Sequence, residues 1–135
     1  MSNPRYVPRQ FLAVPRDFGR RLEPEWVTPD ATYDQRRLAQ LDASKLQHQI
    51  AYGVTELYLK PPRSTKISDL AKALNVEYNR LQKVLSGAVV MQFEDFSRLR
   101  QIIGHQMDYW ILRGPAAKYV RAVEADMRRR QDRAQ

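Results

Sequence analysis

Residues 66–85, with the sequence KISDLAKALNVEYNRLQKVL, constrain the fold of this chain more than any other stretch. Two short segments with helical periodicity flank a tight turn at Leu74-Asn75-Val76, which predicts two helices. Their apolar and small residues lie on the facing sides of these helices and form a small shared core: Leu70, Ala71, Leu74, Val76, Leu81, Val84 and Leu85. The stretch is therefore predicted to be a two-helix unit with one buried side and one exposed side.

The exposed side of the second helix carries side chains that can recognise DNA bases. The same periodicity turns four residues outward: Tyr78, Asn79, Gln82 and Lys83. Asn and Gln can pair with adenine, Lys can donate to guanine, and Tyr can contact a thymine methyl group or a phosphate. A helix that presents these groups while pinned from behind is what reading of the major groove requires. Sequence-specific binding of double-stranded DNA is therefore our leading hypothesis.

The distribution of charge favours a polyanionic partner for the same part of the chain. The net charge is +8, with eight Lys and Arg against four acids in residues 60–104 and seven against four in residues 105–135. Five residues in or beside the two-helix unit are better placed for phosphate than for bases: Lys60, Arg63, Lys66, Arg80 and Ser86. Such contacts set register and affinity without reading sequence. The alternative is a solvated basic surface with no nucleic-acid partner.

Residues 1–32 are predicted to form an extended N-terminal arm. Five of the eight prolines lie in residues 1–30, and proline at this density prevents long helices. Arginines alternate with aromatic residues in this segment: Arg5, Arg9, Arg16, Arg20 and Arg21. One interpretation is an arm that inserts arginine into a minor groove. An arm whose aromatic residues pack on the domain, or a disordered tail, is favoured over it because nearby acids dilute the charge.

Residues 33–104 are predicted to form a compact all-α domain around the two-helix unit. A helix should begin near Tyr33 with Asp30 or Thr32 as its cap, and Asp42 should break and re-cap the chain. The next helix should then run to about Leu59, before Pro61-Pro62. Gly53 weakens that helix unless a neighbour packs close to it. Ser64 or Thr65 should cap the helix that follows.

Two more helices are predicted after the two-helix unit. One runs from Gln92 to Ile103, stops at Gly104, and carries an apolar face made of Phe93, Phe96, Leu99 and Ile103. Residues 105–135 form a helical tail, in which Gly114-Pro115 starts the last helix. An apolar stripe follows this helix: Ala116, Tyr119, Val120, Val123 and Met127. The stripe either packs back on the domain or forms the seam of a homodimer.

Residues 46–104 resemble the helix-turn-helix domain of the lambda-repressor-like, or Xre/Cro, family, over about 60 of the 135 residues. Leu70-Ala71 match the apolar-Ala pair of the family, where Ala71 must be small because the helices cross. Leu74 and Val76 flank the turn, Leu81 and Val84 pin the second helix, and Gly87 closes the unit. Asn75 replaces the usual turn glycine, and Asn tolerates a left-handed backbone better than most residues.

The resemblance implies a function as well as a fold. It implies a transcriptional regulator, and a repressor of the phage-immunity, Cro-like or Xre type that occupies a double-stranded DNA operator. It also implies that Tyr78, Asn79, Gln82 and Lys83 face base edges. The alternatives are a protein-interaction module that grips a partner such as RNA polymerase, and an antitoxin.

Nothing in the sequence indicates an enzyme. The chain has no cysteine, and His48 and His105 have no HxxxH or cysteine partner. No Gly-rich phosphate loop, nucleophile motif or paired acid motif is present. We therefore expect no catalytic residue, metal or cofactor. The apolar runs are too short for a membrane span, so we expect a cytoplasmic, nucleoid-associated protein.

Overall fold

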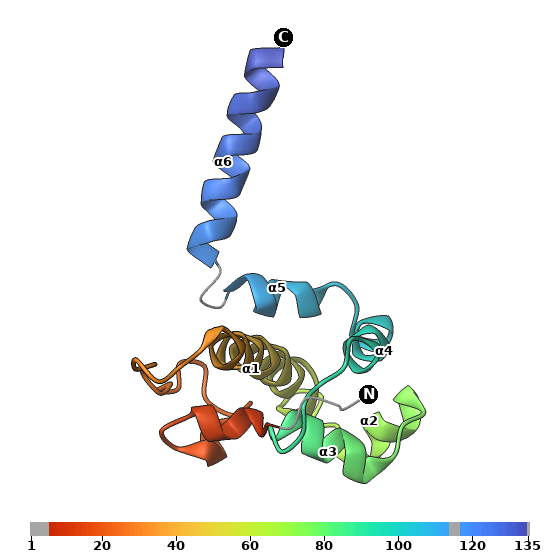
Figure 1. The fold of residues 1–135 in the computed structure, drawn as a ribbon. Coiled ribbons are helices and arrows are strands. Elements are labelled where there is room, and N and C mark those ends of the chain that lie inside the picture. Colours follow the sequence, from red (N-terminus) through yellow and green to blue (C-terminus); the bar gives the residue numbers. More distant parts are fainter. Residues whose placement is uncertain (1–5, 114–116, 135) are drawn as a thin grey trace.

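The longest helix of the described chain, α1 (Gln35–Val54), runs through the molecule, with the N-terminal segment and α3 on one side and α5 on the other (Figure 1). The computed structural model describes residues 6–113 and 117–134. These residues are mostly helical and contain no strand, so the predicted all-α class is confirmed. Besides α1, the helices are η1 (Pro8–Phe11), η2 (Pro15–Asp17), η3 (Thr55–Leu59), α2 (Ile67–Leu74), α3 (Tyr78–Leu85), α4 (Phe93–Ile103), α5 (Gln106–Arg113) and α6 (Ala117–Ala134).

Helix α1 is continuous, and the predicted break at Asp42 is wrong. Asp42 is exposed on the helix surface, where its carboxylate stays in water and does not compete with the helical backbone. The cap is Asp34, whose side chain accepts a hydrogen bond from the Arg37 N–H at 2.8 Å. Asp30 instead holds the backbone of Thr32 in a turn before the helix. At its other end, α1 continues into the single π-helical turn η3 and stops at Lys60.

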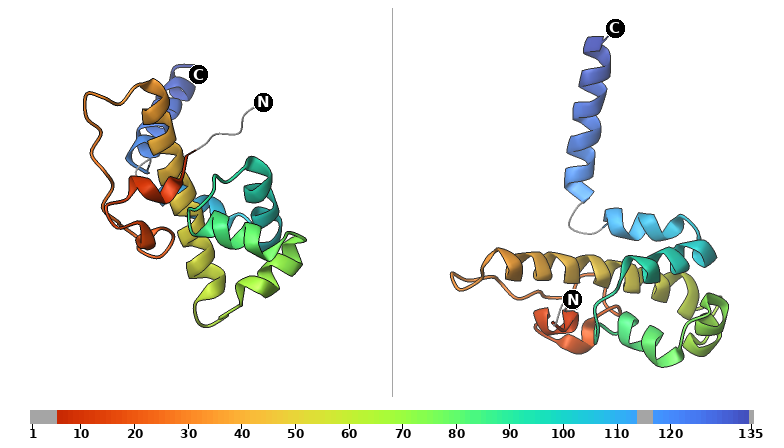
Figure 2. Two further views of the ribbon diagram at one scale, coloured as in Figure 1. Left: turned by 60° about the horizontal axis from the view of Figure 1, so that its bottom comes forward. Right: turned by 45° about the vertical axis from the view of Figure 1, so that its right-hand side comes forward.

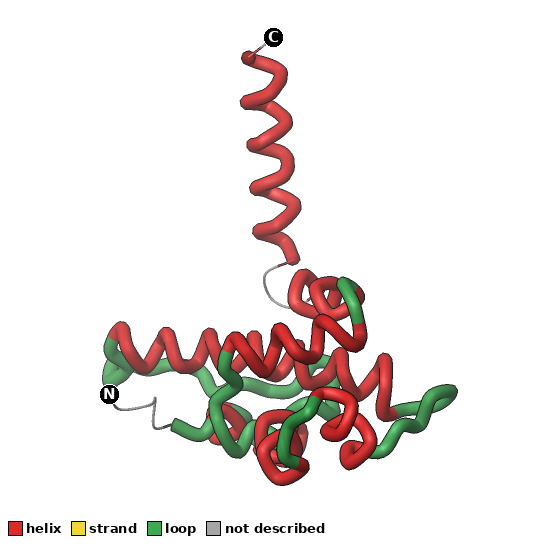
Figure 3. The backbone as a smooth tube through the Cα atoms, turned by 90° about the vertical axis from the view of Figure 1, so that its right-hand side faces the viewer, coloured by secondary structure: helices red, strands yellow, loops and turns green. Residues whose placement is uncertain are grey.

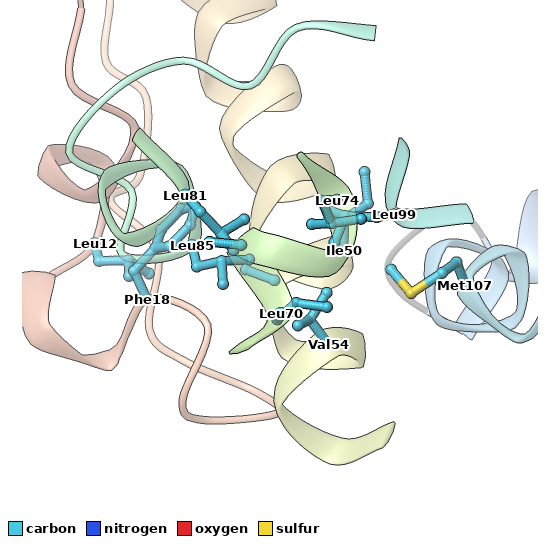
Figure 4. Close-up of a cluster of buried hydrophobic side chains, with 12 residues drawn as sticks. Leu12, Phe18, Ile50, Val54, Leu70, Leu74, Leu81, Leu85, Leu99 and Met107 are labelled. Atoms are coloured by element: carbon cyan, nitrogen blue, oxygen red, sulfur yellow. The ribbon is translucent and has the colours of Figure 1, made fainter. Parts of the chain in front are cut away.

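The core lies where α1, α2, α3, α4, α5 and the N-terminal segment meet (Figure 4). Val54, Leu70, Leu99 and Met107 are at most 1% exposed. Each buried side chain of this size contributes roughly 1.5–3 kcal/mol relative to an exposed one. Helices α2 and α3 occupy the positions predicted for the two-helix unit, and Ala71 is buried between them. Asn75 between them has φ 56° and ψ 47°, the left-handed conformation expected of a turn residue.

Two predictions about helix starts are wrong. Helix α2 begins after Lys66 without a side-chain cap, so neither Ser64 nor Thr65 caps it. Ser64 has a positive φ of 49°, which places it in the preceding loop. Helix α4 begins at Phe93, one residue later than expected, and ends at Ile103 as expected. Phe93 is 92% exposed and does not share the apolar face with buried Leu99. Phe93 is the first residue of α4, and it is Phe96, one turn further on, that packs against the core.

Residues 6–27 pack on the domain and do not extend from it. Phe11, Leu12 and Phe18 are each at most 3% exposed, and an antiparallel bridge joins Leu12 to Trp26. Prolines 8 and 15 begin two short 3₁₀ helices, so the prediction that long helices are absent here is confirmed. Figure 2 shows this segment lying beside α3 and below α1.

The C-terminal part consists of α5, which packs on α1, and α6, which projects beyond α5 (Figures 1 and 3). A side chain at Gly53 would collide with the Trp110 ring, since its Cβ would lie 2.7 Å from a ring carbon. Gly53 therefore has the close neighbour that justifies a glycine within α1. Tyr119, Val123 and Met127 of α6 are all more than half exposed. The predicted helix start at Gly114-Pro115 and the stripe residue Ala116 lie outside the described residues.

Candidate nucleic-acid interface

The outer face of α3 presents the four predicted base-reading residues together. Tyr78, Asn79, Gln82 and Lys83 are all exposed, while Leu81, Val84 and Leu85 are buried on the opposite side. This arrangement follows from a period of 3.6 residues in a helix of eight residues. Tyr78 is 44% exposed. The face is therefore a short polar ridge of amide, ammonium and phenol groups.

Gln47 of α1 attaches the far end of α3 to the core. Its side-chain amide donates to the carbonyl oxygens of Val84 and Val89 at 2.8 and 2.9 Å. Its Oε1 accepts a hydrogen bond from the Met91 N–H at 2.8 Å. Gln47 is 4% exposed, so these bonds satisfy an amide that would otherwise be costly to bury. They also hold the connection that leads from α3 to α4.

Helix α4 is attached to both α2 and α3 by arginine side chains. The Arg80 guanidinium of α3 pairs with the Asp95 carboxylate at 2.6 Å, and Asp95 also accepts from the Gln92 N–H. Gln92 and Asp95 form a reciprocal capping box at the start of α4. Arg98 donates to the Leu74 carbonyl oxygen at 2.9 Å and so satisfies a free carbonyl at the end of α2. The turn between α2 and α3 is thereby fixed to α4.

The N-terminal segment is the third support of α3. The Arg9 N–H donates to the Gly87 carbonyl oxygen at 3.0 Å, and the Phe18 ring lies against Gly87. A Cβ at Gly87 would come within 2.6 Å of the Phe18 ring, and Gly87 has a φ of +75°. A Cβ at Gly19 would lie 2.8 Å from the Leu85 carbonyl oxygen. Both glycines are thus required for the close approach of the segment to the end of α3.

His48 secures this segment from the side of α1. The Gly19 N–H donates to His48 Nδ1 at 2.9 Å, and Thr55 Oγ1 donates to the Gly19 carbonyl oxygen at 3.0 Å. The neutral ring therefore carries its proton on Nε2, which has no hydrogen-bond partner among the described residues. The rings of Phe18 and Trp26 pack edge-on against the imidazole. Burial lowers the pKa of His48, because it disfavours the charged form.

The five residues predicted to contact phosphate differ in whether their side chains already have a partner within the protein. Arg80 is committed to Asp95, and Lys60 pairs with Glu56 at 2.7 Å. The hydrogen bond from Lys60 lowers the pKa of Glu56. The Arg63 guanidinium stacks on the Tyr58 ring at 4.7 Å. Lys66 is exposed at the start of α2, and the Ser86 hydroxyl donates to the Lys83 carbonyl oxygen at 3.3 Å.

The arginines of the predicted arm lie in three situations. Arg5 is outside the described residues. Arg21 is within 3.8 Å of Asp17. Arg9, Arg16 and Arg20 are exposed, and they line depressions of the surface that also contain Ser86 at the end of α3. Folding of the N-terminal segment therefore brings three of the five arginines close to the predicted phosphate contact Ser86.

The residues that support α3 are missing from the sequence-based list of functional residues. Gln47, His48, Gly19 and Arg98 act through partners far along the chain, so no local spacing identifies them. The one available signal is the pair Gln47-His48, polar residues that come just before the buried residues Ile50 and Ala51 of α1.

Other kinds of site are not evident in the described part of the chain. Within residues 6–113 and 117–134, no cluster of three or more His, Asp or Glu side chains is arranged to hold a metal ion. None of the helices in those residues has the length and apolar character needed to cross a membrane.

Comparison of this chain with protein-family models, with curated proteins and with solved structures gave no match.

Proposed function

We propose that this protein is a transcriptional regulator that binds double-stranded DNA in a sequence-specific way, with α2 and α3 as a lambda-repressor-like helix-turn-helix. The observation that carries this proposal is the outer face of α3, which exposes Asn79, Gln82 and Lys83 on a helix anchored from three sides. Rigid placement matters because base readout depends on bidentate hydrogen bonds of fixed geometry.

The dimensions of α3 suit the major groove. With its side chains an α-helix is about 10–12 Å in diameter, and the major groove of B-DNA is about 12 Å wide. Asn79 and Gln82 are three residues apart and lie on one face, so both amides can reach neighbouring base pairs. We assign base contacts to Tyr78, Asn79, Gln82 and Lys83, and backbone contacts to Lys66 and Ser86. Arg80 supports α4 in this assignment, because Asp95 already occupies its guanidinium.

A regulator of this kind needs more contact area than one short helix provides. Single DNA-binding modules bury roughly 600–1,000 Å² of protein surface. A second copy of the chain would double the area, and the exposed stripe of α6 offers a seam for it. We propose a homodimer joined through residues 105–135 that represses by occupying an operator on the nucleoid.

A protein-interaction module is the second candidate. Tyr109 of α5 and the α6 stripe expose aromatic and apolar surface that could receive a protein such as RNA polymerase, or a toxin in the case of an antitoxin. This function would use α5 and α6, with α3 free of base contacts.

Selection of bound sequences from random double-stranded DNA tests the proposal. If the protein reads DNA bases, we expect an enriched sequence motif. If it binds as a dimer, we expect the motif to contain two half-sites about one helical turn apart. Recovery of no enriched sequence, together with a protein that co-purifies through α5 and α6, would favour the interaction module.

A further inference from the structure

A groove runs between the N-terminal segment and α3. It has a volume of about 500 Å³, and its polar lining includes Arg9, Arg20, Gln82, Lys83 and Ser86. A second depression of about 390 Å³ shares Arg9, Arg20 and Ser86 with it and adds Arg16. We call the two together the Arg9–Lys83 groove. It joins residues that are more than sixty positions apart in the sequence.

The Arg9–Lys83 groove is strongly and uniformly basic. Four cationic side chains line it, and no acidic residue is among the residues that line it. Arg9, Arg16, Arg20 and Lys83 form no salt bridge within the described part of the chain. Many other cations near the domain do form one, such as Arg21, Lys60, Arg80, Arg98 and Arg100. Four cations without an acidic partner therefore lie together in the groove, where an anion would neutralise them.

The backbone fixes both walls of the groove before any ligand arrives. The Arg9 N–H is bonded to Gly87 just after α3, and Gly19 is held by His48 and Thr55 of the α1–η3 helix. Arg20 follows Gly19 directly. The guanidinium groups can move because arginine side chains are flexible. The backbone positions of Arg9 and Arg20 are nevertheless fixed relative to Lys83. Such preorganisation lowers the entropic cost of binding.

We propose that the Arg9–Lys83 groove binds phosphodiester groups of the DNA backbone next to the bases that α3 reads. This inference rests on the proposed function and names the partner of the N-terminal arginines. Gln82 and Lys83 belong to both surfaces, so a DNA strand that borders the α3 contact reaches the groove without a gap. Guanidinium groups match phosphate oxygens with paired N–H donors, and the Ser86 hydroxyl adds another donor.

The same geometry argues against minor-groove insertion by these arginines. Insertion needs a segment that leaves the domain and follows the DNA around to an adjacent groove. Residues 8–20 instead lie against α1 and the end of α3, where Phe11 and Phe18 are 2% exposed. Arg9, Arg16 and Arg20 thus contribute affinity and register, while α3 supplies the choice of sequence.

The test is the salt dependence of DNA binding by the full chain with Arg9→Ala and Arg20→Ala together. With a DNA recovered by selection, the slope of log K against log salt should become shallower by about one for each lost phosphate contact, two in all. Affinity for selected and scrambled DNA should fall by the same factor, and the enriched motif should not change. Arg9→Lys with Arg20→Lys retains the charges and should recover most of the slope.

A matched control separates the groove from net charge. Arg36→Ala with Arg121→Ala removes the same charge from exposed residues that do not line the groove, and the slope should change much less. The groove proposal is wrong if the Arg9/Arg20 variant binds as wild type or as this control does. A changed motif would also overturn it, because it would assign the arginines to base or minor-groove readout.

Two more outcomes separate this inference from the proposed function. If wild type enriches no DNA sequence at all, both fail. If inorganic phosphate alone raises the Tm of wild type but not of the Arg9/Arg20 variant, while DNA affinity is the same for both, the groove takes a free anion and the backbone assignment is wrong.

Discussion

Gln47 and His48 are adjacent polar residues of α1 that are buried because each has a backbone partner. Gln47 uses both ends of its amide on residues at the end of α3 and beyond. His48 uses Nδ1 on Gly19 and leaves Nε2 among aromatic rings. Removing either partner would leave a buried polar group unsatisfied, at a cost of about 1–3 kcal/mol. Together the two side chains attach α3 and the N-terminal segment to the same helix, α1.

His48 makes the stability of the protein depend on pH. Its pKa is lowered in the folded state by burial, from an ordinary value of 6.5. The unfolded chain therefore binds a proton at a pH where folded His48 does not, so stability is full above pH 6.5 and falls as pH drops below it. The loss has a limiting slope of about 1.4 kcal/mol per pH unit. Urea unfolding at pH 7.5, 6.5 and 5.5 measures it.

Two single substitutions isolate the contribution of His48. His48→Asn keeps an oxygen acceptor for the Gly19 N–H without a group that titrates, so the fall in stability below pH 6.5 should be much smaller. His105→Asn alters the other histidine, which is exposed, and should leave the fall unchanged. An equal fall in wild type and His48→Asn would contradict this origin of the pH dependence.

Residue roles were only partly predictable from the sequence. Helical periodicity shows which side of α3 is exposed, and Tyr78, Asn79, Gln82 and Lys83 are exposed as that pattern indicates. Periodicity does not show partners on other elements. Arg80 and Lys60 were therefore grouped with the phosphate contacts, although acids on α4 and η3 already pair with them. For the same reason, the supporting roles of Gln47, His48 and Gly19 could not be predicted from the sequence.

Among the elements, the contact between the N-terminal segment and the end of α3 depends on Gly87. Its φ of +75° and the nearby Phe18 ring both oppose a side chain. Gly87→Ala should lower the free energy of unfolding by about 1–3 kcal/mol, through overpacking and a left-handed backbone. Phe18→Leu should relieve part of this loss, which a double-mutant cycle by urea unfolding measures.

Gly104 provides the matched control for that cycle. It also has a positive φ, of +90°, but a Cβ there would meet no atom within 4 Å. Gly104→Ala should therefore destabilise the protein through its backbone alone, and Phe18→Leu should add to this effect independently. Coupling with Phe18 at Gly104 but not at Gly87 would contradict the packing described.

Local patterns predicted the elements best where neighbours in the sequence determine the structure. The bounds of α2, α3 and α4 follow from periodicity, the Asn75 turn and Gly104. Residues 1–32 were harder to predict, because their prolines exclude long helices without indicating where the chain goes. The described part of this segment, residues 6–32, contacts α1 and the end of α3, tens of residues away. The predicted burial of Phe93 was wrong for a related reason, because the exposure of a helical residue depends on which elements pack against that side of the helix.

At the scale of the whole molecule, α6 leaves on the side opposite α3 (Figure 1). A dimer formed through α6 would therefore leave both α3 faces accessible. The stripe residues Tyr119, Val123 and Met127 follow each other at four-residue intervals, which suits pairing with a second helix.

The proposed homodimer predicts a change in mass when this stripe is made charged. Val123→Lys with Met127→Lys should convert a dimer to a monomer in light scattering, because two lysines in the seam would repel their counterparts and lose apolar burial. Arg121→Glu with Arg129→Glu alters residues outside the stripe and serves as the control for a changed charge on α6. A wild-type protein that is monomeric at 0.1 mM would contradict the seam.

The central claim is that α3 reads bases, and the ratio of affinities for selected and scrambled DNA tests it most directly. Asn79→Ala and Gln82→Ala should each reduce this ratio by about 1–3 kcal/mol of discrimination, mainly through weaker binding to the selected DNA. Gln101→Ala, an exposed amide on α4, should leave the ratio unchanged. If the Asn79 and Gln82 variants keep the wild-type ratio, α3 does not read bases and the proposed function is wrong.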